Sequence, residues 1–150
     1  MSYSIQAIVA LQGTFNADPS NGLAIIRLDN GMEIVPIGST ACKLYGIPFL
    51  PLTDEGSEEL PAVLLELYSA LHPQQPVAYI EAEFFGGSGV QAHVLISQNS
   101  ADLGVNVSGD AINNALAWLG VQPRDGKDPF DTVGLGKQRE TDAWLPGCDQ

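Results

Sequence analysis

The sequence has few basic residues, few cysteines and no long apolar run. Only six lysine and arginine residues stand against 18 aspartate and glutamate residues, so the 150-residue chain has a formal net charge of −12. A chain this acidic is repelled by phosphate groups, which argues against binding to nucleic acid or to an anionic membrane. The charge favours a basic protein partner, which it would attract over long distances.

Cysteine is scarce as well, since the chain has only Cys42 and Cys148 and neither belongs to a C-x-x-C pair. Two isolated cysteines are weak grounds for a disulfide framework or a zinc site, so we expect free thiols in a reducing compartment. The opening MSYSIQAIVALQG lacks the charged start and apolar stretch of a signal peptide. No run of about 18 apolar residues indicates a membrane span. These absences predict a cytoplasmic protein.

The common cofactor and nucleophile motifs are also missing. The FFGGSG segment at 84–89 lacks the G-x-G-x-x-G pattern and leads into a predicted strand, whereas a phosphate cradle leads into a helix. The GLGK segment resembles part of a P-loop, but Asp131 replaces its first glycine and Gln138 its serine or threonine. There is no G-x-S-x-G elbow. We therefore expect no cofactor and no metal.

Strand and hairpin patterns dominate what is present. Apolar residues alternate over 3–11, which predicts a strand, and LAIIRLDNGMEIVPI at 23–37 predicts a hairpin. A three-residue loop ending in a left-handed Gly31 would pair Arg27 with Glu33, whereas a two-residue Asn-Gly turn would shift the register. A second hairpin is predicted from strands at 77–85 and 91–97.

Two helices and two irregular segments complete the pattern. Apolar residues at helical spacing predict helices at 58–72 and 109–119. Residues 38–56 form an apolar connection in which Pro48 and Pro51 disfavour a regular helix. We expect this connection to pack against the core, and the alternative is a partner-binding loop.

The order of elements predicts an α+β fold in a single domain, residues 1–150. The sheet is expected to be mostly antiparallel, with about five strands and two helices packed mainly on one face. The core covers about 1–121. Residues 122–150 hold four of the six basic residues and are expected to form an irregular tail that wraps the core, anchored by Phe130, Leu135 and Trp144.

The stretch YIEAEFFGGSGVQAHVLIS at 79–97 holds the candidate site. If Phe84 pairs with Ala92, Glu83 lies opposite His93 and one polar patch forms on the sheet, from Tyr79, Glu81, Glu83, Gln91 and His93. The patch is open to three interpretations: a Glu83–His93 acid–base pair, a metal site at Glu81, Glu83 and His93, or a solvated sheet face with one charge pair.

Three segments resemble a group of small, acidic, uncharacterised bacterial proteins of the toxin–immunity type: AYIEAEFFGGSGVQAHVL, AINNALAWLGV and DPFDTVGLGKQRETDAWL. The resemblance covers the C-terminal half of the chain and supplies no catalytic residues. It implies a cytoplasmic bacterial protein that neutralises a partner.

Taken together, these patterns lead us to expect a non-enzymatic protein-binding module, such as an immunity protein or inhibitor of a basic protein. The expected contact surface is the polar patch, with Tyr45 and Phe49 as candidate anchors. One alternative is a small enzyme or metal-binding protein that uses Glu81, Glu83 and His93. A second alternative is a structural or adaptor subunit of an assembly.

Overall fold

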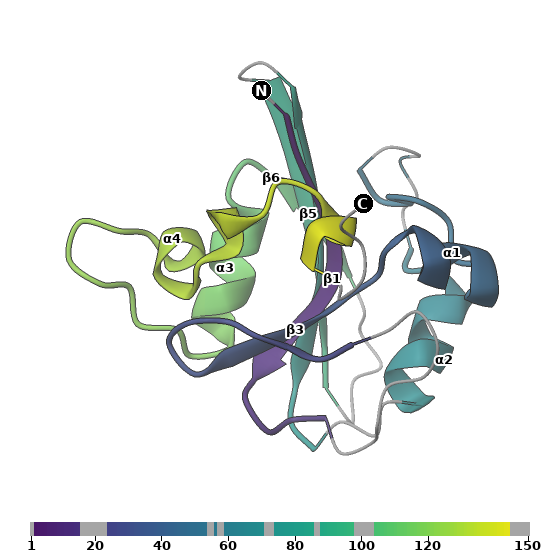
Figure 1. Cartoon of the computed structure of the whole chain (residues 1–150), viewed down its shortest axis with the longest axis horizontal. Helices are drawn as coiled ribbons and strands as arrows, with labels where there is room; N and C mark the ends of the chain where they lie inside the picture. The colour runs from purple at the N-terminus through teal and green to yellow at the C-terminus, as the bar shows by residue number, and fades with distance from the viewer. Residues whose placement is uncertain are drawn as a thin grey trace.

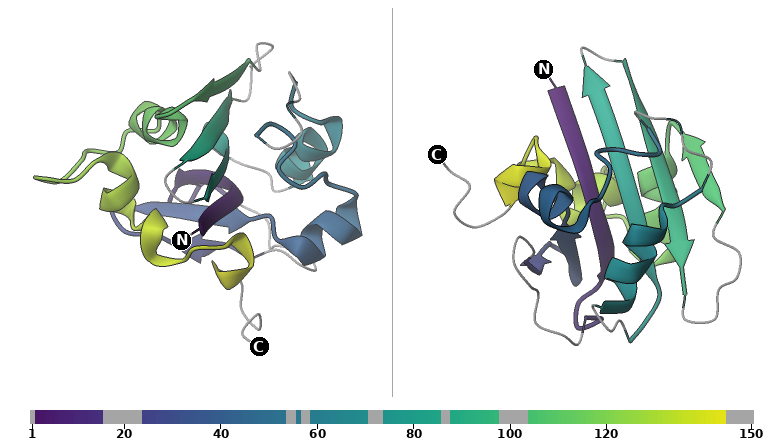
Figure 2. Two further views of the ribbon diagram at one scale, coloured as in Figure 1. Left: turned by 90° about the horizontal axis from the view of Figure 1, so that it is seen from above. Right: turned by 90° about the vertical axis from the view of Figure 1, so that its right-hand side faces the viewer.

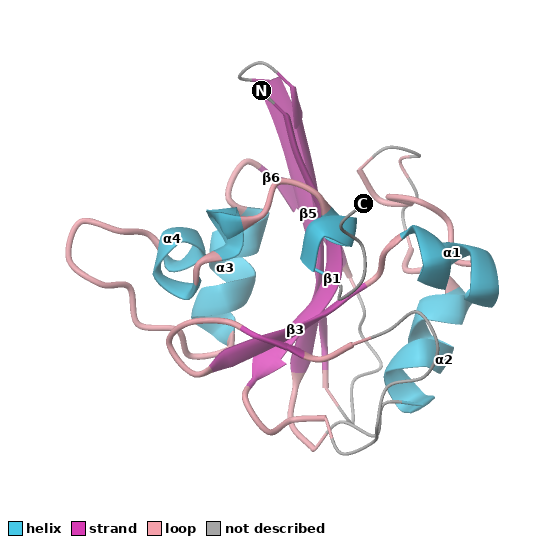
Figure 3. Cartoon of the chain, in the orientation of Figure 1, coloured by secondary structure: helices cyan, strands magenta, loops and turns pink. Residues whose placement is uncertain are grey.

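A six-stranded antiparallel sheet forms the centre of the computed structural model, which describes residues 2–15, 24–53, 56, 59–70, 74–85, 88–97 and 104–144 (Figures 1 and 3). The strand order is β2-β3-β1-β4-β5-β6. The strands are β1 Ser2–Leu11, β2 Ile26–Arg27, β3 Met32–Pro36, β4 Val77–Phe85, β5 Ser88–Ile96 and β6 Val105–Ser108. The predicted α+β class and antiparallel sheet are confirmed.

Helices cover both faces of the sheet, so the expectation that they pack mainly on one face is wrong (Figure 2). Helices α1 Ser39–Tyr45 and α2 Ala62–Ala70 lie on one face, and α3 Ala111–Trp118 and α4 Pro129–Val133 lie on the other. Strand β1 explains this arrangement. Its residues Ile8 and Ala10 are buried under the first pair of helices, and Ile5, Ala7 and Val9 are buried under the second. A strand that is apolar on both sides requires cover on both sides.

The first hairpin has the three-residue loop. Arg27 pairs with Glu33, and the backbone N–H of Leu28 donates to the carbonyl of Met32 at 2.9 Å. Asn30 and Gly31 both have left-handed backbone angles, with φ of 63° and 74°. Asparagine and glycine tolerate this conformation, and of the two turns that the sequence allows the structure has the three-residue loop.

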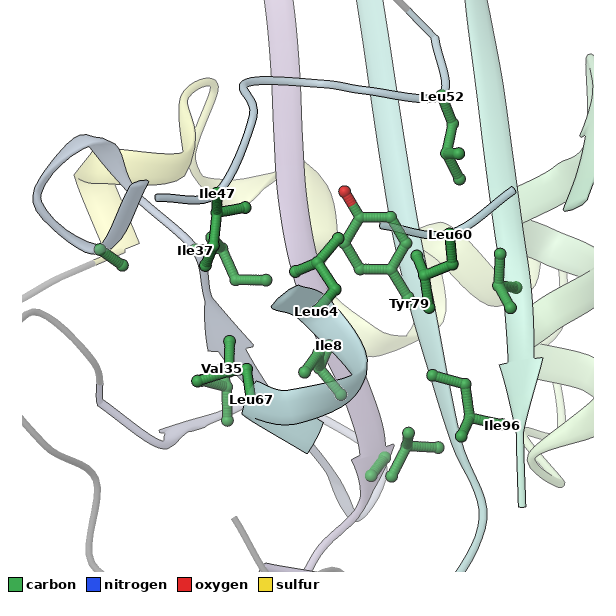
Figure 4. Close-up of a cluster of buried hydrophobic side chains, with 14 of the residues drawn as sticks. Ile8, Val35, Ile37, Ile47, Leu52, Leu60, Leu64, Leu67, Tyr79 and Ile96 are labelled. Atoms are coloured by element: carbon green, nitrogen blue, oxygen red, sulfur yellow. The ribbon is translucent and has the colours of Figure 1, made fainter. Parts of the chain in front are cut away.

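The apolar connection departs from the prediction at its start, because residues 39–45 form helix α1. The helix ends at a left-handed Gly46, before Pro48 can interfere with it. The rest of the connection crosses the sheet with Ile47, Leu50 and Leu52 buried, which confirms its packing against the core. Figure 4 shows Ile47 and Leu52 in the same cluster as Tyr79 of β4.

Helix α2 begins later than predicted. Residues 59–61 are not helical, and the helix starts at Ala62, directly after Pro61. Proline disfavours helical geometry in the residue before it, which explains why Leu60 is not helical and the helix starts after the proline. Leu64 and Leu67 point from α2 toward the sheet (Figure 4). The predicted helical positions 58 and 71–72 lie outside the described residues.

The C-terminal segment is more regular than expected, with helix α4 and two short 3-10 turns, η1 Leu135–Lys137 and η2 Thr141–Trp144. As expected, Leu135 is buried, and Phe130 and Trp144 pack against the same core cluster. The segment also bonds to strand β1, because the N–H of Ser4 donates to the carbonyl of Arg139 at 2.9 Å. None of the helices in the described ranges is long and apolar enough to cross a membrane.

Candidate functional site

The second hairpin has a different register from the predicted one. Phe84 pairs with Gly89 instead of Ala92, and Ile80 lies opposite His93. The observed register differs from the predicted one by three residues. Because three is an odd number, each side chain of the second strand points to the opposite face of the sheet from the one predicted. Tyr79, Glu81 and Glu83 therefore lie on the face of α1 and α2, whereas Gln91 and His93 lie on the face of α3. The predicted Glu83–His93 pair and the shared polar patch are both wrong.

Gly89 accounts for the observed register. The ring of Phe84 lies against its α-carbon, and a Cβ built on Gly89 would come within 1.7 Å of Phe84 Cδ1. Only glycine allows this approach. The sequence shows a Gly-rich break between the two strands, and such a break is compatible with several registers.

Glu81 is buried in a dense set of hydrogen bonds on the α1/α2 face, with 0% of the residue exposed. Its carboxylate accepts the backbone N–H groups of Leu52 at 3.1 Å and Thr53 at 2.9 Å. It also accepts the hydroxyls of Thr53 at 3.0 Å and Tyr79 at 2.5 Å. Segment 52–53 therefore covers the carboxylate. In this structure neither Glu81 nor the buried Tyr79 can contact a partner.

Gln6 of β1 completes this set of hydrogen bonds. Its Nε2 donates to the carbonyl of Pro48 and to the hydroxyl of Tyr79, both at 3.0 Å. Its Oε1 accepts the N–H of Leu50 at 3.2 Å, and Cys42 Sγ lies 4.0 Å from the same oxygen. We call Gln6, Tyr79, Glu81 and Thr53 the buried polar cluster. It fastens the 48–53 segment to the sheet from both β1 and β4.

Burial controls the protonation of this cluster. Burial raises the pKa of the Tyr79 hydroxyl well above its usual value, and the adjacent Glu81 charge raises it further. Burial also raises the pKa of Glu81, while the hydrogen bonds from Tyr79, Thr53 and Leu52 oppose that shift. The carboxylate is fully buried and accepts hydrogen bonds from four protein groups, so the arrangement suits a structural role better than acid–base chemistry.

Gln91 and His93 hold the start of α3 on the opposite face. Gln91 Nε2 donates to the carbonyl of Gly109 and its Oε1 accepts the N–H of Ile112, both at 2.9 Å. His93 is buried, with Nδ1 2.7 Å from the carbonyl oxygen of Ala111. The sheet separates His93 from Glu81 and Glu83, so these three residues cannot share one ion. Within the described ranges, no group of three His, Cys, Asp or Glu residues is placed to hold a metal.

The two candidate anchors have different environments. Tyr45 is half-buried against the core, whereas Phe49 is 55% exposed. Leu44 on α1 is similarly exposed, at 56%. Phe49 lines a hollow of about 190 Å³, whose other lining residues are Ser4, Ile37, Gly38, Ser39, Glu140 and Thr141.

The backbone around Phe49 is fixed although its side chain is exposed. Gln6 bonds the carbonyl of the preceding Pro48 and the N–H of the following Leu50. Leu50 is buried and has φ of 45°, a left-handed conformation that is uncommon for leucine. Backbone strain of this kind persists only where the surroundings enforce it, and it concentrates at functional sites.

Several of these residues were absent from the sequence-based site, namely Gln6, Leu44, Thr53 and Glu140. Gln6 had a usable signal, since it is a polar residue inside the apolar strand IQAIVAL. The other three carry no pattern that marks them. Cys42 retains its thiol, and Cys148 lies outside the described residues. Comparison of the chain with protein-family models, curated proteins and solved structures gave no match.

Proposed function

We propose that this chain is a non-enzymatic, acidic protein-binding module that uses Phe49 as the anchor for a basic partner protein. The immunity-type inhibitor suggested by the sequence resemblance, acting in the cytoplasm, is the form of this function that we favour. One observation carries the proposal: a strained and hydrogen-bonded backbone holds an aromatic side chain in solvent beside a hollow.

An apolar side chain that is held in water lowers the stability of the free protein. Binding removes that side chain from water and so favours the complex. Aromatic anchors provide much of the binding energy at interfaces, and a preorganised anchor loses little conformational entropy when the complex forms. Leu44 is also exposed and lies five positions before Phe49 in the sequence. Glu140 adds a carboxylate at the rim of the hollow.

The net charge of −12 supports a basic partner. Charge of one sign over a whole domain speeds the encounter with an oppositely charged protein, and salt screens this attraction. We call the exposed Phe49 side chain and the hollow that it lines the Phe49 surface. In this proposal the overall charge sets the association rate, and the Phe49 surface sets the lifetime of the complex.

The test starts with capture of partners from a lysate of the source organism at low and high salt, identified by mass spectrometry. A captured basic protein is then purified, and its affinity is compared for the wild type, Phe49→Ala and Trp118→Ala. Trp118 is the matched control, an exposed aromatic residue on α3 (45% exposed) across the sheet from Phe49.

Loss of a buried anchor weakens binding by more than about tenfold, which is the expected result for Phe49→Ala. Trp118→Ala should bind like the wild type. Equal affinities for Phe49→Ala and the wild type would refute the anchor. Failure to capture a basic protein at either salt concentration would count against the function itself.

An adaptor subunit is the second candidate, favoured by the open edge of the sheet. Strand β6 lies at the end of the strand order and carries Val107, which is 52% exposed. Exposed edges of this kind can pair with strands of other chains. Light scattering at high concentration distinguishes the two candidates, because self-assembly through β6 predicts a stable oligomer and the binding module predicts a monomer.

A further inference from the structure

A second hollow, of about 220 Å³, lies on the α3/α4 face of the molecule. Its apolar wall consists of Phe84, Ile112 and Phe130, and its polar wall of Gln91, Asn113 and Asp128. The strands β4 and β5 and the helices α3 and α4 each contribute to it, so the hollow combines aromatic rings with one carboxylate.

The aromatic wall is held in place from behind. Tyr3 packs against both rings, with centroid distances of 6.2 Å to Phe84 and 5.5 Å to Phe130. The Tyr3 hydroxyl donates to the carbonyl of Leu135 at 3.1 Å, which fixes the middle ring. Phe84 also rests against Gly89, where a side chain would collide with it. The wall is therefore formed before any ligand arrives.

The carboxylate is fixed in the same way. Asp128 caps α4 by accepting the N–H of Asp131 at 2.9 Å, and its other oxygen accepts Asn113 Nδ2 at 3.1 Å. Asn113 in turn accepts the N–H of Phe130 at 2.9 Å. Asp128 is exposed, and each carboxylate oxygen can accept a further hydrogen bond. The Asp128 side chain is thus held in one orientation, and its oxygens can still accept hydrogen bonds from a ligand.

The chemistry of this hollow selects a cation that has a flat apolar face. Aromatic rings attract cations over their faces, and a carboxylate binds the two parallel N–H groups of a guanidinium better than an ammonium. The exposed Asp131, whose backbone N–H donates to Asp128, adds negative charge nearby. Lys137, which pairs with Asp29 at 2.9 Å, lowers the pKa of that carboxyl, and the bases of the 124–128 segment, Arg124 and Lys127, lie close enough to lower it further.

We infer that this hollow binds an arginine side chain of a partner protein, with the guanidinium on Asp128 and its plane against the phenylalanine rings. The inference does not depend on Phe49, because the hollow lies across the sheet from α1 and shares no residue with the Phe49 surface. The two sites can be tested and can fail separately.

The test is an NMR titration of the full chain with N-acetyl-arginine amide and, separately, N-acetyl-lysine amide. We expect saturable shifts of the side-chain amides of Gln91 and Asn113, with arginine binding more tightly than lysine. Asp128→Asn should weaken arginine binding about tenfold, because it removes a charge-assisted pair. Asparagine caps helices as well as aspartate does, so the cap of α4 should remain, while the hydrogen bond from Asn113 Nδ2 is lost because an amide has one acceptor oxygen.

Asp125→Asn is the matched control, since it removes the same charge from an exposed residue that does not line the hollow. It should bind arginine like the wild type. Equal weakening in both variants would assign the binding to overall charge and overturn the site. Equal affinity for the lysine compound would overturn the guanidinium assignment, and the absence of saturable shifts up to about 100 mM would remove the site altogether.

Discussion

Gln6 is the residue on which the proposed presentation of Phe49 depends, and Gln6→Leu tests that dependence directly. Leucine has a similar volume and an apolar character that suits strand β1, so the change removes hydrogen bonds with little change in packing. The buried N–H of Leu50 and the carbonyl of Pro48 both lose their partner. The hydroxyl of Tyr79 loses one donor but keeps its bond to Glu81.

The expected loss of stability comes from the two backbone groups that lose their hydrogen-bond partner. A buried polar group without a partner costs about 1–3 kcal/mol, and Pro48 is only half-buried, so its carbonyl costs less than the N–H of Leu50. We expect Gln6→Leu to lower the free energy of unfolding by about 2–4 kcal/mol. This is a large part of the roughly 5–15 kcal/mol available to a domain of this kind.

Urea unfolding followed by circular dichroism measures this free energy, with Gln12→Leu as the control. Gln12 is exposed in the turn after β1, so its replacement should change stability by less than about 0.5 kcal/mol. Hydrogen exchange localises the effect, because the Leu50 and Leu52 amides should lose protection first. If Gln6→Leu is as stable as Gln12→Leu, the buried polar cluster does not hold the 48–53 segment and the explanation for Phe49 fails.

Two further predictions concern the second hairpin. Gly89→Ala should displace the Phe84 ring and destabilise the protein by about 1–3 kcal/mol, as overpacking does; thermal unfolding measures this, and an unchanged melting temperature would contradict the close contact. Burial raises the folded-state pKa of Glu81 above its ordinary value of 4.5, so the folded state binds this proton more tightly than the unfolded state. The resulting contribution to stability is complete below pH 4.5 and is lost as the pH rises through the raised pKa. Glu81→Gln should remove that part of the pH dependence in urea unfolding, and parallel profiles for the two proteins would show that Glu81 does not cause it.

Elements with strong local signals could be predicted from the sequence. The DNG sequence predicted the position of the first hairpin turn because two successive residues tolerate positive φ, but it left two registers open, of which the structure has the Arg27–Glu33 pairing. Strand β4 has its predicted bounds, 77–85, because Pro76 and the Gly-rich break limit an apolar run. Helix α3 ends close to its predicted limit, since the apolar stripe stops at Leu119 and Gly120 follows.

The site could not be predicted because its determinants are distant in the sequence. Apart from the Tyr79 hydroxyl, the donors that surround Glu81 come from residues 52 and 53, and nothing in the hairpin indicates that these residues cover it. The register depends on one ring against one glycine, which is a property of packed side chains and not of periodicity. Strand β6 has no strong strand signal in the sequence, because VNVS is short and forms a strand beside β5.

The polar residues of the second hairpin hold neighbouring segments in place instead of forming one surface. Glu81 points to one face and fastens the segment that carries Phe49, while Gln91 points to the other and fastens the start of α3 beside the Asp128 hollow. In both cases a polar side chain accepts a backbone N–H and a neighbouring residue stays exposed. Such a scaffold can carry recognition residues that vary without loss of the fold, because the residues that contact a partner are not those that hold the chain together.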